Sequence, residues 1–256
     1  MKTAKLMTFI LGAALSCMAE LALAQAATVT TVGGTVQAIP NAGAPRTLRM
    51  GDSVNQGDTI STGADSSAVV QFADGQILAL PSKSRAAITT YAYNKANPAA
   101  GKVLITLLEG GMRAVTGSIG EANPAAVSYR AGEATIDIKG TDVSVATIAG
   151  NLVITVTKGE ISFLFQGKTT TVRAGQGLDA RTDGTIRVAA LAAFVSNLPA
   201  DLKNIFSDMD KITLGRLIQQ AGQSDLRSNP LGTPTTTGAS GSSGSGGSGG
   251  GGASTR

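Results

Sequence analysis

The stretch from Thr135 to Val145, which reads TIDIKGTDVSV, decides the fold class of this chain. Isoleucines before the pair Gly140-Thr141, and valines after it, alternate with polar residues. Alternation with a period of two is typical of a half-buried strand, and a glycine within such a run marks a kink or a tight turn. We therefore expect two strand segments that meet at Gly140-Thr141, and nothing in the stretch is typical of a catalytic centre.

Short runs of the same kind fill residues 28–188 and recur about every 8 to 12 residues, a spacing typical of all-β folds. Turn-forming pairs such as Gly51-Asp52 and Asp74-Gly75 separate them. The aromatic content is 4% with no tryptophan, so a core of Val, Ile, Leu and Ala is expected. The predicted fold is a solenoid-like or rolled two-sheet β-domain, with a jelly-roll-like β-sandwich as the alternative.

The N-terminus has the features of a secretory signal peptide over residues 1–24. Two lysines precede an apolar run over residues 6–15, and Ala22-Leu23-Ala24 has small residues where a signal peptidase cleaves. A lipoprotein signal ending at Cys17 is the less favoured alternative, because Leu15 stands one place later than in the usual lipobox. Cleavage after Ala24 removes the single cysteine, so we expect a mature chain without thiols or disulfides, periplasmic or secreted, that does not span the membrane.

The pattern changes again after residue 188. Within residues 189–222, apolar residues follow the i, i+3, i+4, i+7 spacing of an amphipathic helix at Leu202, Ile205, Phe206 and Met209. We expect these helices to cap an open end or a face of the β-domain, and a partner-binding helix is the alternative. Residues 223–256 are rich in Gly and Ser and are expected to form a disordered tail.

Composition excludes most enzyme chemistry. The chain contains no histidine, and its one cysteine falls in the signal peptide, so nucleophilic triads and thiolate or imidazole zinc sites are excluded in the mature protein. The net charge of +4 arises without any basic cluster, which argues against binding to nucleic acid. We therefore predict no catalytic, cofactor-binding or metal-binding residues, and we expect the protein not to be an enzyme.

Acidic residues leave two weaker alternatives open. A pair of carboxylates can hydrolyse a glycoside, and the candidates are Glu109, Asp137 and Asp142; the alternation places the two aspartates on a solvated face, which is the better interpretation. Calcium binding would draw on dispersed aspartates, but the chain lacks the dense acidic loop that an EF-hand requires. Those aspartates are Asp52, Asp58, Asp65 and Asp74.

An ordered set of segments between about Val32 and Gly175 resembles the FecR family of extracytoplasmic β-domains. The segments are Val32–Val36, Leu48–Asp52 with Gly57–Gly63, Phe72–Pro81, Leu108–Arg113 with Gly117, Ile138–Val145, and Gly159 followed by Ala174–Gln176. The resemblance implies a periplasmic, all-β domain that acts through protein contacts, as in sensors that link an outer-membrane receptor to a sigma factor. It also singles out residues whose roles we expect to be structural: Gly110, Arg113, Gly117, Gly140, Thr141, Val143 and Gly175.

The chain departs from the plan of those sensors. The resemblance implies that a full sensor has a short cytoplasmic helical region, one transmembrane helix, the β-domain and a receptor-contacting C-terminal module. In this chain we expect a signal peptide, the β-domain, helices and a glycine-rich tail instead. We therefore predict a non-enzymatic binding or scaffold module whose partner is a protein or an envelope component. A component of cell-surface signalling is the alternative, and a carbohydrate-active enzyme is the second alternative.

Overall fold

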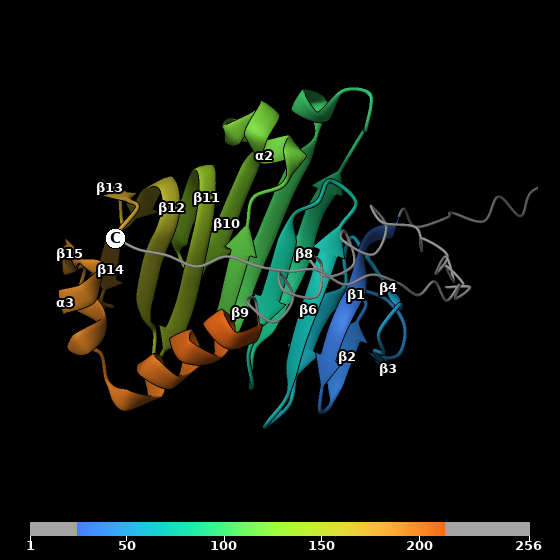
Figure 1. Cartoon of the computed structure of the whole chain (residues 1–256), viewed down its shortest axis with the longest axis horizontal. Coiled ribbons are helices and arrows are strands. Elements are labelled where there is room, and N and C mark those ends of the chain that lie inside the picture. The colour runs from blue at the N-terminus through green and yellow to red at the C-terminus, as the bar shows by residue number, and fades with distance from the viewer. Residues whose placement is uncertain (1–24, 213–256) are drawn as a thin grey trace, which may run out of the picture. The chain divides into compact units, whose positions relative to one another are not determined.

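The computed structural model describes residues 25–212, which lie within one compact unit of the chain. Strands dominate these residues and join in one hydrogen-bonded sheet that does not close on itself (Figure 1). The prediction of an all-β domain with short helices is confirmed. The predicted signal peptide and disordered tail lie outside the described residues, as do residues 213–222 of the predicted helical segment.

The strands are β1 (Gln25–Gly33), β2 (Val36–Ile39), β3 (Arg46–Thr47), β4 (Ser53–Asn55), β5 (Thr59–Thr62), β6 (Ser67–Phe72), β7 (Ile77–Leu80), β8 (Arg85–Ala92), β9 (Lys102–Val115), β10 (Val127–Ala131), β11 (Ala134–Ile148), β12 (Asn151–Phe165), β13 (Lys168–Arg173), β14 (Gln176–Ala180) and β15 (Ile186–Ala190). The helical elements are η1 (Pro98–Ala100), α2 (Ser118–Ala122), η2 (Pro124–Ala126), α3 (Leu191–Ser196) and a further helix described over residues 200–212, here named the C-terminal helix.

The strand pairings divide the sheet into two layers. The first layer has the order β3-β2-β5-β8-β9-β10-β11-β12-β13, and the second has the order β4-β1-β6-β7-β9-β11-β12-β14-β15. Three long strands, β9, β11 and β12, belong to both layers, because their two halves pair with different neighbours. The layered arrangement follows from these pairings, whereas the solenoid-like character stays a prediction.

Both layers contribute side chains to a single core. Ile60, Ile88 and Ile105 of the first layer belong to the same buried cluster as Leu78 and Val143 of the second. Burying an aliphatic side chain of this size contributes roughly 1.5–3 kcal/mol. The alternation of the sequence therefore corresponds to the packing, since the apolar side chains of this cluster point into the core and the polar side chains that alternate with them point to the opposite face.

Glycines mark the points where the long strands pass from one layer to the other. Gly140 divides β11 at a φ of +60°, and Gly159 divides β12 at +76°, in the left-handed region that L-residues rarely adopt. A Cβ on Gly159 would lie 2.6 Å from the carbonyl oxygen of Lys139, so no side chain fits between the two bends. Of the two conformations that the TIDIKGTDVSV stretch allowed, the structure has the kink: one bent strand, not two strands joined by a turn.

Helices cover part of the outer face of the second layer. The C-terminal helix runs across this face (Figure 1), and its residues Leu202, Phe206 and Met209 are buried against Ala146 of β11 and Val153 of β12. The predicted amphipathic face is therefore a packing face. The β-domain ends two residues later than expected, because β15 pairs with β14 up to position 190. Within residues 25–212, no helix is both long enough and apolar enough to cross a bilayer.

Candidate functional site

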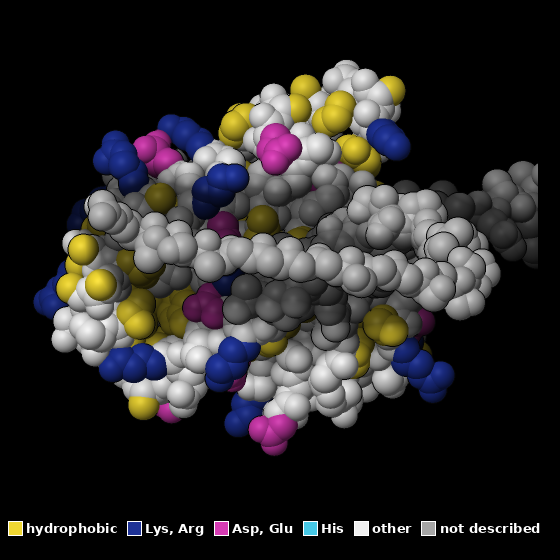
Figure 2. Space-filling model, in the orientation of Figure 1, with side chains coloured by type: hydrophobic (Ala, Val, Ile, Leu, Met, Phe, Trp, Pro, Cys, Tyr) yellow, Lys and Arg dark blue, Asp and Glu magenta, His cyan; other side chains and the backbone are white. Residues whose placement is uncertain are grey.

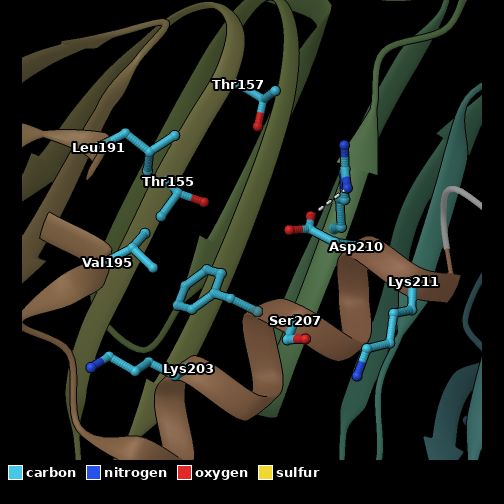
Figure 3. Close-up of a pocket in the computed structure, with 10 residues that line it drawn as sticks. Thr155, Thr157, Leu191, Val195, Lys203, Ser207, Asp210 and Lys211 are labelled. Carbon is cyan, nitrogen blue, oxygen red and sulfur yellow. Dashed lines mark hydrogen bonds and ion pairs between the residues drawn. The ribbon is translucent and has the colours of Figure 1, made fainter. Parts of the chain in front are cut away.

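The outer face of the second layer carries a groove of about 640 Å³ beside the C-terminal helix. Thr155 and Thr157 of β12 line it from the sheet, while Leu191 and Val195 of α3 line it from one side (Figure 3). The C-terminal helix forms the other side through Phe206 and a set of polar residues, which are Lys203, Ser207, Asp210 and Lys211. Figure 2 shows hydrophobic side chains gathered near α3, with Lys and Arg side chains around them.

Arg113, singled out by the family resemblance, lies at this groove and binds two carboxylates. Its Nε and Nη2 atoms donate bidentate hydrogen bonds to the Asp142 carboxylate at 2.8 and 2.7 Å. Its Nη1 atom donates to Asp210 of the C-terminal helix at 2.6 Å. The Arg113 and Asp142 side chains are only 13% and 16% exposed, whereas Asp210 is 70% exposed. The hydrogen bonds to Asp142 raise the pKa of Arg113, against the opposing effect of burial.

This geometry corrects one interpretation made from the sequence. The alternation of the sequence predicts a solvated Asp142, but the carboxylate of this residue is largely enclosed and neutralises Arg113. The alternation placed Asp142 correctly on the outward side of β11. It could not reveal that the C-terminal helix covers that side, because the helix comes from a segment far along the chain.

We expect Arg113→Ala to lower the free energy of unfolding by about 2 kcal/mol, because it leaves the enclosed Asp142 carboxylate without a partner. Asp210→Ala should cost less than about 1 kcal/mol, since an exposed ion pair contributes little. Urea unfolding followed by circular dichroism measures both. The double variant Arg113→Ala/Asp142→Ala should recover part of the loss, and strict additivity would contradict the coupling. If Arg113→Ala left stability unchanged but abolished a partner interaction, Arg113 would be a binding residue.

The other residues singled out by the resemblance lie away from the groove. Val143 is in the core, and Gly175 lies at a turn between β13 and β14 with a φ of +79°. Thr141 donates its backbone N–H to the Thr116 hydroxyl at 2.8 Å, and that hydroxyl donates to the Thr141 carbonyl, also at 2.8 Å. Gly110 has a φ of +74° where β9 passes between layers. A structural role for these positions stays a prediction, and Arg113 is the one residue of the set that lines the groove.

A polar cluster around Asp74, which the sequence did not reveal, explains why position 117 is a glycine. A Cβ on Gly117 would lie 2.5 Å from a carboxylate oxygen of Asp74. That carboxylate accepts hydrogen bonds from the Tyr91 hydroxyl at 3.2 Å and from the Gln76 backbone N–H at 3.2 Å. The buried Tyr129 hydroxyl donates to the Gln76 side-chain oxygen at 3.5 Å. The cluster joins the β6–β7 turn to the core below it.

Alkaline pH should destabilise the protein through these tyrosines. Burial, reinforced by Asp74, raises the pKa of both Tyr91 and Tyr129 above the usual value of about 10. The unfolded chain releases these protons near pH 10 while the folded chain retains them, so the stabilisation is complete below about pH 10 and is lost at higher pH.

For Tyr129 the loss should approach about 1.4 kcal/mol per pH unit above pH 10. Urea unfolding at pH 9 and pH 11 should therefore show a smaller decrease for Tyr129→Phe than for the wild type. The phenylalanine variant also controls for lysines, which titrate in the same range. Equal pH dependence in the two proteins would contradict the assignment.

The structure does not assemble the carboxylates considered for glycoside hydrolysis. Asp137 and Leu104 both lie opposite Ser128, and Glu109 lies five residues further along β9. At about 3.3 Å per residue, Glu109 is displaced from Asp137 by roughly 16 Å along the strands alone, which already exceeds the separation of about 5–10 Å that glycosidases use. Asp142 is held by Arg113.

The aspartates considered for calcium are likewise dispersed. Asp58 pairs with Arg46 at 2.8 Å, Asp52 accepts a hydrogen bond from the Arg49 backbone N–H at 2.7 Å, and Asp74 belongs to the tyrosine cluster. In residues 25–212 there is no group of three or more acidic, His or Cys side chains placed to hold a metal ion.

Solved structures similar to this chain include two crystal structures, each of a proposed anti-sigma factor from Parabacteroides distasonis. One has 15% sequence identity and a TM-score of 0.42, and the match covers 52% of this chain and 59% of that chain. The other has 14% identity and a TM-score of 0.43, and the match covers 60% of this chain and 74% of that chain. No curated protein matches the chain in a sequence comparison.

The family comparison agrees with the motifs. The model described as FecR protein matches residues 58–162, a span that includes the strand bends at Gly140 and Gly159 and the Arg113–Asp142 pair. The resemblance to the FecR family is therefore confirmed for residues 58–162 of this chain.

Proposed function

We propose that this protein is a non-enzymatic module of the cell envelope that acts by contacting another protein, as a regulator in cell-surface signalling. The observation that carries the proposal is the docking of a helix on the outer face of the second layer, where the family residue Arg113 binds an acidic side chain of that helix. Recognition of an amphipathic helix on an apolar surface is a recurring mode of protein binding.

The match of residues 58–162 to the FecR family supports the signalling role and an envelope location. A scaffold function without signalling is the second candidate. The signal-peptide pattern supports export, and a mass spectrum of the secreted chain that begins near Gln25 would establish it.

Site-specific photo-crosslinking in intact cells tests the contact. A photoreactive amino acid at Ser207, an exposed residue of the groove, should give a discrete crosslinked product with another protein. The matched control is Thr89, an exposed residue of β8 in the first layer, where no such product is expected. The same products at both positions, or none at either, would contradict the proposal.

Transcription distinguishes the two candidate functions. Deletion of the gene should change the expression of a small, sigma-factor-dependent set of genes if the protein regulates signalling. An unchanged transcript profile, together with the Ser207 crosslink, would favour the scaffold.

A further inference from the structure

The second layer ends at strand β15, whose outer edge carries unpaired backbone groups. Within residues 25–212, β15 pairs with β14 alone. On the β14 side, the Leu191 N–H donates to the Gly175 carbonyl oxygen at 2.8 Å, and the Thr185 carbonyl oxygen accepts a hydrogen bond at 2.9 Å. Successive residues of an antiparallel strand direct these groups to opposite sides. Ile186 and Val188 therefore direct their N–H and C=O groups away from β14.

The four edge strands of the described sheet differ in how they are protected from further pairing. Natural sheets protect their edges by short strands, lysines or prolines. β3 and β4 have only two and three residues. β13 begins with Lys168, ends with Arg173 and has three threonines between them. β15 reads IRVAA, with five residues, one charge and no proline, so it is the edge that lacks this protection.

An exposed apolar run begins on β15 and continues into α3. Residues 188–195 read VAALAAFV, and Phe194 is the one buried side chain among them. Val188 is 38% exposed, although Leu178, directly opposite on β14, belongs to the core. Directly opposite residues point to the same face, so Val188 lies at an open end of the core, where β15 ends the sheet (Figure 1). Exposed apolar runs of this length mark contact surfaces.

The edge of β15 is complementary to a second copy of itself. In an antiparallel pair with a two-fold axis at Val188, the Val188 residues of both copies face each other. Ile186 then faces Ala190 of the second copy, and Arg187 faces its Ala189. This register joins the outward-directed backbone groups of the two strands and pairs all five residues of β15. It also places no like charges directly opposite each other.

From this edge we propose that β15 pairs with β15 of a second copy, so that the protein forms a two-fold homodimer. The pairing uses the same strand of both copies, so it leaves no β15 edge free and stops at two chains. Opposite residues of the pair point to the same face, so the outer faces of the two second layers join in one surface that carries both grooves. This inference goes beyond the proposed function, because it concerns the edge of the sheet and not the groove.

Sedimentation equilibrium of the chain from Gln25 to Arg256 tests the pairing. We expect the mass of two chains at the upper end of a range from about 1 to 100 μM, which covers the dissociation of weak dimers. Val188→Lys should remove the dimer over this range, because two lysines would then face each other across the axis. Thr171→Lys is the matched control, since it adds the same charge at an exposed position of β13 and should leave the dimer intact.

Val188→Pro tests the backbone groups separately from the charge. Proline lacks the N–H donor, and an edge strand accepts proline where the N–H faces solvent. The Val188 N–H points away from β14, so this variant should keep its fold and lose the dimer. Far-UV circular dichroism checks the fold of each variant, and Val188→Lys decides the matter if the proline variant unfolds.

Disulfide formation tests the register of the pair. The chain from residue 25 onward contains no cysteine. The Cα atoms of a hydrogen-bonded antiparallel pair lie about 5.5 Å apart, within the range of about 4.4–6.8 Å that a disulfide spans. Val188→Cys should therefore form an intermolecular disulfide under mild oxidation, whereas Thr171→Cys should not.

A wild type that stays monomeric up to about 100 μM would overturn the proposal and leave the edge to a strand of another protein. A dimer that persists in folded Val188→Lys would also overturn it, because the copies would then meet through another surface. Equal disulfide formation at positions 188 and 171 would indicate random collision and contradict the register. None of these outcomes bears on the Ser207 crosslink, so the proposed function is tested separately.

Discussion

Gly159→Ala is expected to lower the free energy of unfolding by about 2 to 5 kcal/mol. A left-handed backbone at an L-residue costs roughly 1–2 kcal/mol, and Gly159 has a φ of +76°. Crowding in a filled space adds about 1–3 kcal/mol, because the new Cβ meets the backbone carbonyls of residues 139 and 140. The loss is a large fraction of a typical stability of about 5–15 kcal/mol.

Gly140 provides the matched control for this effect. Its φ is also positive, but no atom lies within 4 Å of the position that a Cβ would take. Gly140→Ala should therefore cost only the backbone strain, about 1–2 kcal/mol, and Gly140→Val should exceed about 2 kcal/mol because a β-branched residue tolerates this region poorly. Urea unfolding followed by circular dichroism compares all three. Equal stabilities for Gly159→Ala and Gly140→Ala would show that the close approach of β11 and β12 does not matter.

Removal of the helical segment should have the largest effect of all. A chain that ends at Gly222 should be as stable as the full chain, since residues 223–256 are short of apolar side chains. A chain that ends at Ala190 loses five buried apolar side chains from the outer face of the second layer: Phe194, Leu198, Leu202, Phe206 and Met209. At roughly 1.5–3 kcal/mol each, their burial is comparable to the whole margin of a domain.

The shorter chain should therefore unfold at a lower temperature and aggregate through the exposed apolar face. Thermal unfolding and size-exclusion chromatography compare the two truncations. The cut follows Ala190 because β15 pairs with β14 up to that residue, and an earlier cut would damage the sheet as well. A soluble chain ending at Ala190 with undiminished stability would show that the helices do not support the β-domain.

Local patterns in the sequence determined the fold class, the helical face at residues 202–209 and the special position of Gly140. These features depend on neighbouring residues along the chain: a period of two predicts a strand, a period near 3.6 predicts a helix, and glycine permits a bend. The FecR motifs likewise identified Arg113 and the glycines, but not what each of them touches.

Only the tertiary structure decided which strands are neighbours and which side chains meet. Alternation tells which side of a strand is buried, but not which element buries it. Arg113 therefore finds Asp142 from 29 residues away and Asp210 from 97 residues away, and Gly111 is needed because of a helix almost as distant. The groove depends on these long-range contacts, since it forms where a C-terminal helix packs on strands from the middle of the chain.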